Sequence, residues 1–176
     1  MNFTEILDKR QSCRNFNPEK EVSDNDIAAL LNAVRLSPSA CNSQPYFVTV
    51  CKGEAAAKAA RATQKMGANK FASKAPVMFV ISEDEYNKSA AVGAKAMKND
   101  FRSIDIGIIT ANIVSMASEL GLSSCIIGWL DEEKLKELCD VSGTVRLVIA
   151  IGYAADGDKL RPKKRKATDA LSKVIE

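Results

Sequence analysis

The sequence predicts an α+β fold in which helices flank a central mixed β-sheet. Three apolar, strand-like runs carry this prediction, at residues 46–51, 75–81 and 145–153, with helical patterns between them. The second run is apolar without interruption, which is typical of a strand buried on both faces and places it near the centre of the sheet. With 176 residues, of which 46% are hydrophobic, the chain can bury one good core, so we expect a single domain over residues 1–176.

Apolar residues at three- and four-residue spacing predict the helices. The strongest pattern runs from Asp105 to Leu120, with Gly121 where a C-terminal cap belongs. We expect this helix to lie in the core or at a dimer interface. The other predicted helices are a short one near the N-terminus and the segments 23–36, 54–64 and 131–138. Ser23 and Asp26 form a capping-box-like start for the first of these segments, and Asp131 caps the last. A fourth strand is expected at 123–129, and residues 83–100 fit either a helix or a mobile loop.

The composition excludes several classes of chemistry. The chain has no histidine, which removes Ser-His and Cys-His nucleophiles and the commonest metal ligand. Its five cysteines are scattered without a C-x-x-C pair, so we expect no metal site and reduced thiols. No apolar run approaches the roughly 20 residues of a membrane span, and no signal peptide is evident, so we expect a cytoplasmic protein. If the chain is an enzyme, a bound cofactor should carry the chemistry.

Two basic segments are candidates for binding an anion. In the first, Arg10 and Arg14 flank Ser12, and arginine is the side chain best suited to bidentate binding of phosphate or carboxylate. The second, residues 160–166, contains five cationic side chains, whereas the net charge of the whole chain is only +3. Either segment alone also fits a solvated turn or tail, and the second resembles a nuclear-localisation or nucleic-acid patch. Its position directly after a strand also fits the second half of a phosphate clamp.

A polar loop at residues 35–45 joins a predicted helix to the first predicted strand. Pro38 and Pro45 end regular structure, and the small or amide side chains between them offer hydrogen-bond donors and acceptors with little bulk. Such a rigid, polar loop suits the wall of a site for a flat ligand. A well-capped connection without a ligand is an equally good interpretation of this loop alone.

Four stretches together resemble the nitroreductase family of FMN-dependent oxidoreductases, in the family's order and over nearly the whole chain. Residues 10–16 resemble its Arg-x-Ser-x-Arg-x-Phe signature, and residues 35–45 resemble its Ala-Pro-Ser-x-x-Asn-x-Gln-Pro loop. Residues 121–128 resemble its Gly-Leu-Gly-x-x-x-x-Gly strand, and the Gly-Tyr pair at 152–153 with the basic cluster resembles its C-terminal end. The resemblance implies a nitroreductase-like fold and an intertwined homodimer.

The resemblance also implies a set of FMN-binding positions, and no catalytic side chain besides the flavin. The phosphate and ribityl chain would be held by Arg10, Gln11, Ser12, Arg14, Lys163 and Arg165. The isoalloxazine would be lined from the other subunit by the loop residues Pro38, Ser39, Ala40, Asn42 and Gln44. Ile126, Ile127 and Gly128 would lie along the flavin, with backbone amides near N5, and Asn69 would contact the flavin or the substrate.

The implied activity is a ping-pong cycle in which hydride passes from NADH or NADPH through FMN to a flat acceptor such as a nitroaromatic or a quinone. One alternative is a flavin-binding protein that reduces no external substrate. Another is a nucleic-acid-binding protein that uses residues 161–166, although nucleic-acid modules usually spread basic residues over a face interleaved with aromatics. Whether residues 83–100 cover the flavin stays open.

Overall fold

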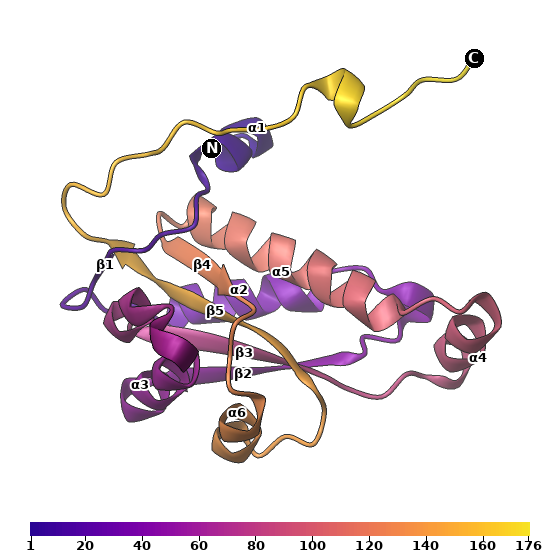
Figure 1. The fold of residues 1–176 in the computed structure, drawn as a ribbon, viewed down its shortest axis with the longest axis horizontal. Helices are drawn as coiled ribbons and strands as arrows, with labels where there is room; N and C mark the ends of the chain where they lie inside the picture. Colours follow the sequence, from indigo (N-terminus) through magenta and orange to yellow (C-terminus); the bar gives the residue numbers. More distant parts are fainter.

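An antiparallel β-sheet forms the centre of the molecule in a computed structural model that describes residues 1–176 (Figure 1). Its strands lie in the order β4-β5-β3-β2, and β1 pairs with the end of β5. The strands are β1 (Phe16–Asn17), β2 (Tyr46–Lys52), β3 (Val77–Glu83), β4 (Ser123–Ile127) and β5 (Val145–Ala154). All of the strands pair antiparallel. The parallel pairing expected of a mixed sheet is limited to one isolated bridge, between Ser12 and Ser124. The α+β prediction is confirmed.

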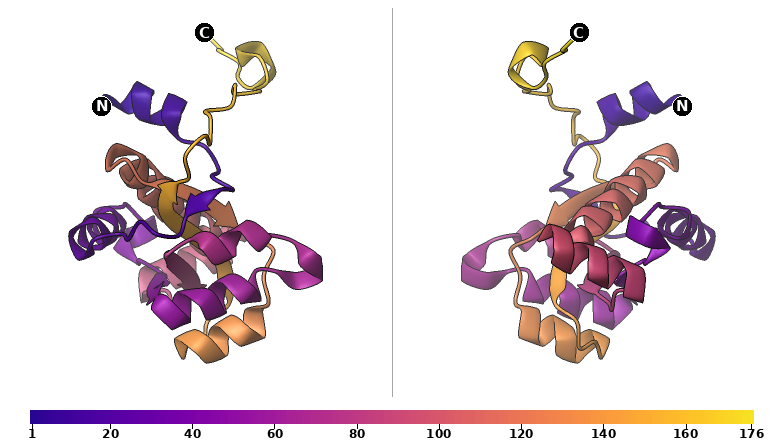
Figure 2. Two further views of the ribbon diagram at one scale, coloured as in Figure 1. Left: turned by 90° about the vertical axis from the view of Figure 1, so that its left-hand side faces the viewer. Right: turned by 90° about the vertical axis from the view of Figure 1, so that its right-hand side faces the viewer.

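Helices cover both faces of this sheet, α2 and α5 on one face and α3 and α6 on the other (Figure 2). The helices are α1 (Phe3–Lys9), α2 (Asp24–Arg35), α3 (Gly53–Ala62), α4 (Lys88–Met97), α5 (Phe101–Glu119) and α6 (Glu132–Cys139). Short 3₁₀ turns occur at Ala40–Asn42, Lys65–Gly67, Lys70–Lys74 and Thr168–Ala170. None of the helices combines the length and the apolar character needed to cross a membrane.

Strand β3 shows why two cores form. Its Met78 and Val80 side chains pack with α3 and α6, whereas Phe79 and Ile81 pack with α2 and α5. Successive side chains of a strand point to opposite faces, and each fully buried apolar side chain contributes about 1.5–3 kcal/mol. The uninterrupted apolar run therefore serves both faces, and the predicted central position of this strand is confirmed.

The helices begin and end close to the predicted residues. The Ser23 side chain accepts a hydrogen bond from the backbone N–H of Asp26, and Asp131 does the same for Lys134. Gly121, at φ +75°, terminates α5 in the left-handed conformation that glycine tolerates best. Helix α5 starts at Phe101, four residues before the predicted start, because Asp100 caps it through the backbone N–H of Ser103.

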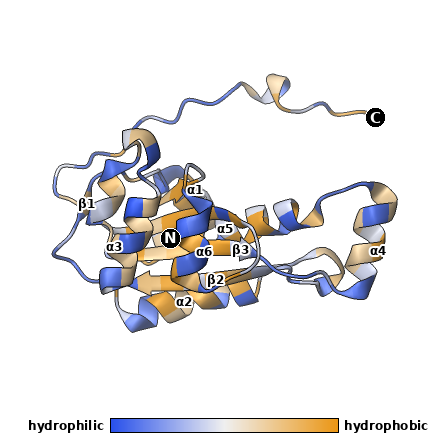
Figure 3. Cartoon of the chain, turned by 60° about the horizontal axis from the view of Figure 1, so that its bottom comes forward, coloured by the Kyte–Doolittle hydropathy of each residue, from blue (hydrophilic) through white to orange (hydrophobic).

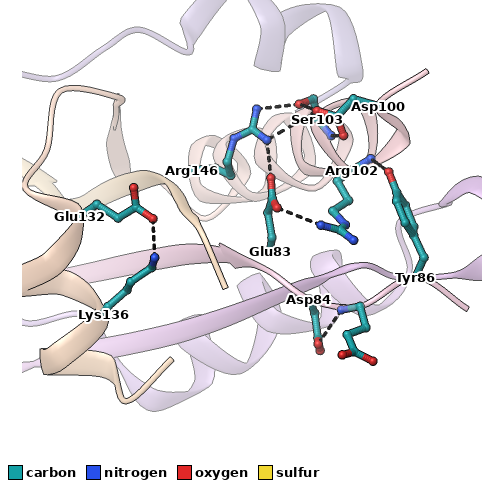
Figure 4. Close-up of polar contacts among 10 residues, drawn as sticks. Glu83, Asp84, Tyr86, Asp100, Arg102, Ser103, Glu132, Lys136 and Arg146 are labelled. Atoms are coloured by element: carbon teal, nitrogen blue, oxygen red, sulfur yellow. Dashed lines mark hydrogen bonds and ion pairs between the residues drawn. The ribbon is translucent and has the colours of Figure 1, made fainter. Parts of the chain in front are cut away.

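The segment 83–100 contains helix α4 and is tied to the sheet by polar contacts (Figure 4). Glu83 at the end of β3 accepts from Arg102 of α5 at 3.0 Å and from Arg146 of β5 at 2.5 Å. The Tyr86 hydroxyl accepts from the backbone N–H of Arg102 at 2.8 Å. The turn before β5 lies close to the end of β3, since a Cβ added at Gly143 would lie 1.9 Å from the carbonyl oxygen of Glu83.

The C-terminal segment from residue 155 leaves the sheet and passes α1, so both termini lie on the same side of the molecule (Figure 1). Its last residues form hydrogen bonds only among themselves, around the turn at 168–170. This end carries exposed apolar side chains, Leu171, Val174 and Ile175, and appears in orange beyond the hydrophilic basic stretch (Figure 3).

Candidate functional site

Two basic segments about 150 residues apart in sequence meet at one recess. The residues that follow α1 line one side of it, and the residues that follow β5 line the other. The recess has a volume of about 290 Å³ and contains no apolar side chain except that of a proline. We call it the basic cradle; it is lined by Arg10, Gln11, Ser12, Arg14, Arg161, Pro162, Lys163, Lys164 and Arg165.

Backbone contacts fix the two walls of the cradle. The Arg161 guanidinium donates to the carbonyl oxygen of Ser12 at 2.6 Å, and the Lys163 ammonium donates to that of Arg10 at 2.5 Å. The Gln11 side chain accepts from the backbone N–H of Arg161 at 3.0 Å. The first wall is joined to the sheet in turn, because the backbone N–H of Cys13 donates to the carbonyl oxygen of Ser124 in β4.

The charges of the cradle are not balanced within the chain. Six of its residues are cationic, and the structure gives one acidic partner, Asp158, which pairs with Arg161 at 3.3 Å. The side chains of Arg10 and Arg14 form no hydrogen bond or ion pair. Desolvation and the nearby positive charges of Arg10 and Arg165 lower the pKa of Lys163, and the nearby carboxylate of Asp8 opposes this shift in part. An anion in the cradle would relieve this repulsion, so the residues present fit a phosphate group.

Strand β4 leads away from the cradle along the edge of the sheet. It pairs with β5 on one side, and its outer side is paired only at Ser124. Ile126 is 42% exposed, whereas Ile127 is 3% exposed and lies in the core between the sheet and α3. Ser124 and Gly128 are about 13 Å apart at the usual strand rise. The strand therefore offers an apolar side chain at 126 and free main-chain groups next to an anion site.

Gly128 and Asn69 lie at the far end of this strand. A Cβ added at Gly128 would meet nothing within 4 Å, so packing within the chain does not require glycine there. The Asn69 amide donates to the carbonyl oxygens of Thr63 at 3.0 Å and of Trp129 at 3.4 Å. Asn69, predicted as a flavin or substrate contact, thus also anchors the chain that follows Gly128.

The polar loop at 37–45 is held rigidly by α4 and α5. The Asp105 carboxylate, on a side chain that is 2% exposed, accepts from the backbone N–H of Ala40 at 3.2 Å. The Asn87 side chain donates to the carbonyl oxygen of Cys41 at 2.9 Å. Asn42, at φ +51°, and Gln44, at φ +48°, take the left-handed conformation, and the Gln44 amide donates to Asn42.

A single chain does not bring this loop to the cradle. The loop is anchored at Asp105 near the start of α5, while Ser118 near the end of the same helix lines a cavity beside Arg10. At 1.5 Å per residue, these two points of α5 are about 20 Å apart. Pro38 and Ser39 accordingly lie with the other loop residues, away from the cradle.

Two residues of the site were not singled out from the sequence. Arg161 stood within the basic cluster, but only the fold reveals its contacts with both walls of the cradle. Asp105 carries a signal that can be recognised, since it precedes Ile109 and Ile113 at four-residue steps and so falls on the buried face of α5. A carboxylate on an apolar face needs a partner, and here the partner is the backbone of the loop. Burial raises the pKa of Asp105, and the hydrogen bond from Ala40 opposes this rise.

Comparison with known proteins identifies the family. The sequence profile described as the Nitroreductase family matches residues 7–66 and 52–153. The chain therefore belongs to the nitroreductase family.

Individual relatives agree with this assignment. The chain is 29% identical over 160 residues to a protein of Archaeoglobus fulgidus provisionally named NADH dehydrogenase/NAD(P)H nitroreductase, covering 84% of this chain and 82% of that protein. A shorter match, 44% identical over 50 residues, joins it to the major NAD(P)H-flavin oxidoreductase of Aliivibrio fischeri, over 28% of this chain and 23% of that one.

Solved structures share the fold. A nitroreductase family protein of Streptococcus pneumoniae TIGR4 superposes with a TM-score of 0.81 at 22% identity, covering 99% of this chain and 100% of that chain. A provisionally named nitroreductase of Exiguobacterium sibiricum, solved in complex with FMN, gives a TM-score of 0.83 at 18% identity, covering 99% and 98%. The predicted nitroreductase-like fold is confirmed.

Proposed function

We propose that the protein is an FMN-dependent NAD(P)H oxidoreductase that reduces flat acceptors such as nitroaromatics and quinones. The observation that carries the proposal is the basic cradle, in which two distant segments gather six cations around a recess with one acidic partner. The phosphate of FMN would neutralise this charge. The names of the relatives, which refer to flavin, FMN and NAD(P)H, support the same cofactor and donor.

Each part of the site has a task in this proposal. Arg10, Arg14 and Lys163 hold the phosphate, Ser12 and Arg165 assist, and the edge of β4 runs beside the ribityl chain and the ring. The exposed Ile126 side chain gives the ring an apolar contact. Gly128 leaves main chain open to the ring, because no side chain covers it. FMN, when bound, supplies the hydride chemistry, accepting from the nicotinamide and donating to the second substrate.

The proposed site is completed by a second copy of the chain. The loop at 37–45 is rigid and rich in polar groups, but it lies about 20 Å along α5 from the cradle of its own chain. A twofold dimer would bring the loop of one protomer to the cradle of the other, with Pro38, Ser39 and Asn42 against the ring. The exposed apolar end of the chain also suits such an assembly, since it packs on nothing in its own protomer.

A complementation experiment tests the shared site. Arg14→Ala damages the cradle, and Asn42→Gly removes a loop side chain at a φ of +51° that glycine adopts without strain. Each variant alone has two damaged sites per dimer. A mixed dimer, purified through two different affinity tags, would carry one site with both changes and one intact site. We expect it to regain about half of the tightly bound FMN. No regain would mean that cradle and loop do not belong to sites shared between chains.

Turnover separates the proposal from a flavin-binding protein that reduces no external substrate. Steady-state rates measured at several fixed NADH and acceptor concentrations should give the parallel double-reciprocal lines of a ping-pong cycle. FMN binding without any acceptor reduction would favour the alternative. The nucleic-acid alternative gains little from the fold, because Arg161 and Lys163 are bound to the backbone of residues 10–12 and face a small recess.

A further inference from the structure

A carboxylate lies beside the basic cradle, although its charge would not help to bind an anion. Asp158 belongs to the turn that follows β5, and its side chain is 11% exposed. Its Oδ1 atom accepts a hydrogen bond from the Arg161 guanidinium at 3.3 Å. A negative charge at this place repels a phosphate bound in the cradle. The contacts of Asp158, rather than its charge, therefore have to explain its place in the site.

The backbone fixes the position of Asp158 independently of its side chain. The backbone N–H of Ala155 donates to the carbonyl oxygen of Asn15 at 2.8 Å, which ties the end of β5 to the segment that follows α1. The backbone N–H of Asp158 donates to the carbonyl oxygen of Ala155 at 3.1 Å and closes a turn. Gly157 in this turn has a φ of +83°, which glycine adopts without strain. The carboxylate is thus presented by a well-anchored turn.

The Arg161 guanidinium joins this turn to the other wall of the cradle. Its Nη1 donates to Asp158, and its Nη2 donates to the carbonyl oxygen of Ser12 at 2.6 Å. A guanidinium is planar and its donors have a fixed spacing, so the contact with Asp158 sets the direction of the second donor. The Arg161 side chain is 48% exposed, so packing alone does not hold it in this orientation.

The arginine in turn balances the charge of the carboxylate. The Oδ2 atom of Asp158 is buried and has no hydrogen-bond partner, so Arg161 is the only partner of this side chain. A carboxylate that is shielded from water is costly to leave unpaired. Each member of the pair therefore holds the other, and the guanidinium stays directed at the backbone of Ser12.

We propose that Asp158 is a positioning residue for FMN, which holds the Arg161 guanidinium against Ser12 and so keeps the two walls of the cradle at the spacing that the phosphate requires. This inference rests on the proposed FMN site. Without the carboxylate, the guanidinium would be free to turn towards solvent, and one contact between the walls would be lost. The contacts made by Gln11 and Lys163 would remain, so the cradle should loosen rather than come apart.

The direction of the effect on FMN binding separates positioning from simple electrostatics. Removing a carboxylate near a phosphate lowers the repulsion, so charge alone predicts that Asp158→Ala binds FMN more tightly. Positioning predicts weaker binding. Residues of one hydrogen-bonded network change each other's contribution by about 2- to 150-fold. We expect the dissociation constant of FMN to rise by about tenfold in Asp158→Ala, near the middle of that range.

Titration of the apo-protein with FMN, followed by flavin fluorescence, measures this constant, and urea unfolding checks that each variant is folded. Asp156→Ala is a matched control, because Asp156 lies in the same turn, is exposed and forms no hydrogen bond or ion pair. It removes the same charge and should not weaken binding. Asp158→Asn keeps an oxygen that accepts from the guanidinium, so it should retain part of the affinity that Asp158→Ala loses. An equal loss in these two variants would overturn the positioning role.

A second comparison tests whether Asp158 acts through Arg161. In an Arg161→Ala background the guanidinium is gone, so adding Asp158→Ala should leave the affinity for FMN unchanged or raise it. A folded Asp158→Ala protein that binds FMN as tightly as the unchanged protein, or more tightly, would overturn the proposal. So would an equal loss in both backgrounds, because the carboxylate would then act without the arginine. These outcomes overturn the inference alone, whereas an unchanged protein that binds no FMN would refute the proposed function together with it.

Discussion

Removing the Arg14 guanidinium isolates the contribution of one cradle cation to cofactor binding. The side chain of Arg14 forms no hydrogen bond or ion pair within the chain, so Arg14→Ala removes no internal contact. Surface changes of this kind usually alter the free energy of unfolding by less than about 0.5 kcal/mol. The fold of the variant should therefore be intact, and the effect should fall on the ligand.

The expected loss of FMN affinity follows from the number of contacts removed. One hydrogen bond to a charged group contributes about 1.5–3 kcal/mol. This range corresponds to an increase in the dissociation constant of FMN of about 10- to 150-fold. At high salt we expect an increase near the lower limit of this range, because five other cations remain in the cradle and ions screen the phosphate.

Titration of apo-protein with FMN, followed by the change in flavin fluorescence, measures this constant. Arg61→Ala is a matched control, because Arg61 is an exposed residue of α3 whose side chain has no hydrogen bond or ion pair. The control should bind FMN like the unchanged protein. Equal affinity for Arg14→Ala and Arg61→Ala would refute the phosphate role of the cradle.

Three further changes test the fold and the loop. Gly143→Ala should lower the free energy of unfolding in urea by about 1–3 kcal/mol, because its Cβ would meet the Glu83 carbonyl oxygen, whereas Gly107→Ala, with open space at its Cβ in α5, should cost nothing. Glu83→Gln should lower the free energy of unfolding by about 2 kcal/mol in the same assay, since it leaves two half-buried arginines without their carboxylate. An unchanged free energy would mean that this ion-pair network does not contribute to stability. Because the pKa of Asp105 is raised in the folded protein, the folded state binds the proton of this carboxyl more tightly than the unfolded state does. The contribution of Asp105 to the free energy of unfolding therefore falls as the pH rises from the ordinary aspartate pKa through the pKa in the folded state. Asp105→Asn should remove that fall; an unchanged pH profile of urea unfolding would contradict the burial argument.

Local patterns predicted most of the architecture. The apolar run of β3 indicated its central position, and the caps at Ser23 and Asp131 indicated where helices begin, because these signals act within a few residues. The sequence pattern of residues 83–100 fits both a helix and a mobile loop. Its order depends on Arg102 and Arg146, which reach Glu83 from other elements, and no local pattern reports such contacts.

The candidate site was only partly accessible from the sequence. The resemblance to the family proposed both basic segments, but their convergence rests on contacts such as that between Arg161 and Ser12, 149 residues apart. Similarly, Ile126 and Ile127 were predicted together, although strand alternation exposes one and buries the other. Ile127 can therefore contribute only its backbone to the proposed flavin site.

The absorbance spectrum of the protein loaded with FMN, recorded under argon before and after addition of NADH or NADPH, tests the central proposal most directly. We expect the protein to retain FMN through gel filtration as a dimer, and either nucleotide to bleach the visible absorbance of the oxidised flavin. An added nitroaromatic or quinone should then restore the absorbance. A folded protein that fails to take up FMN would contradict the account, and one whose bound flavin neither nucleotide reduces would contradict the proposed activity.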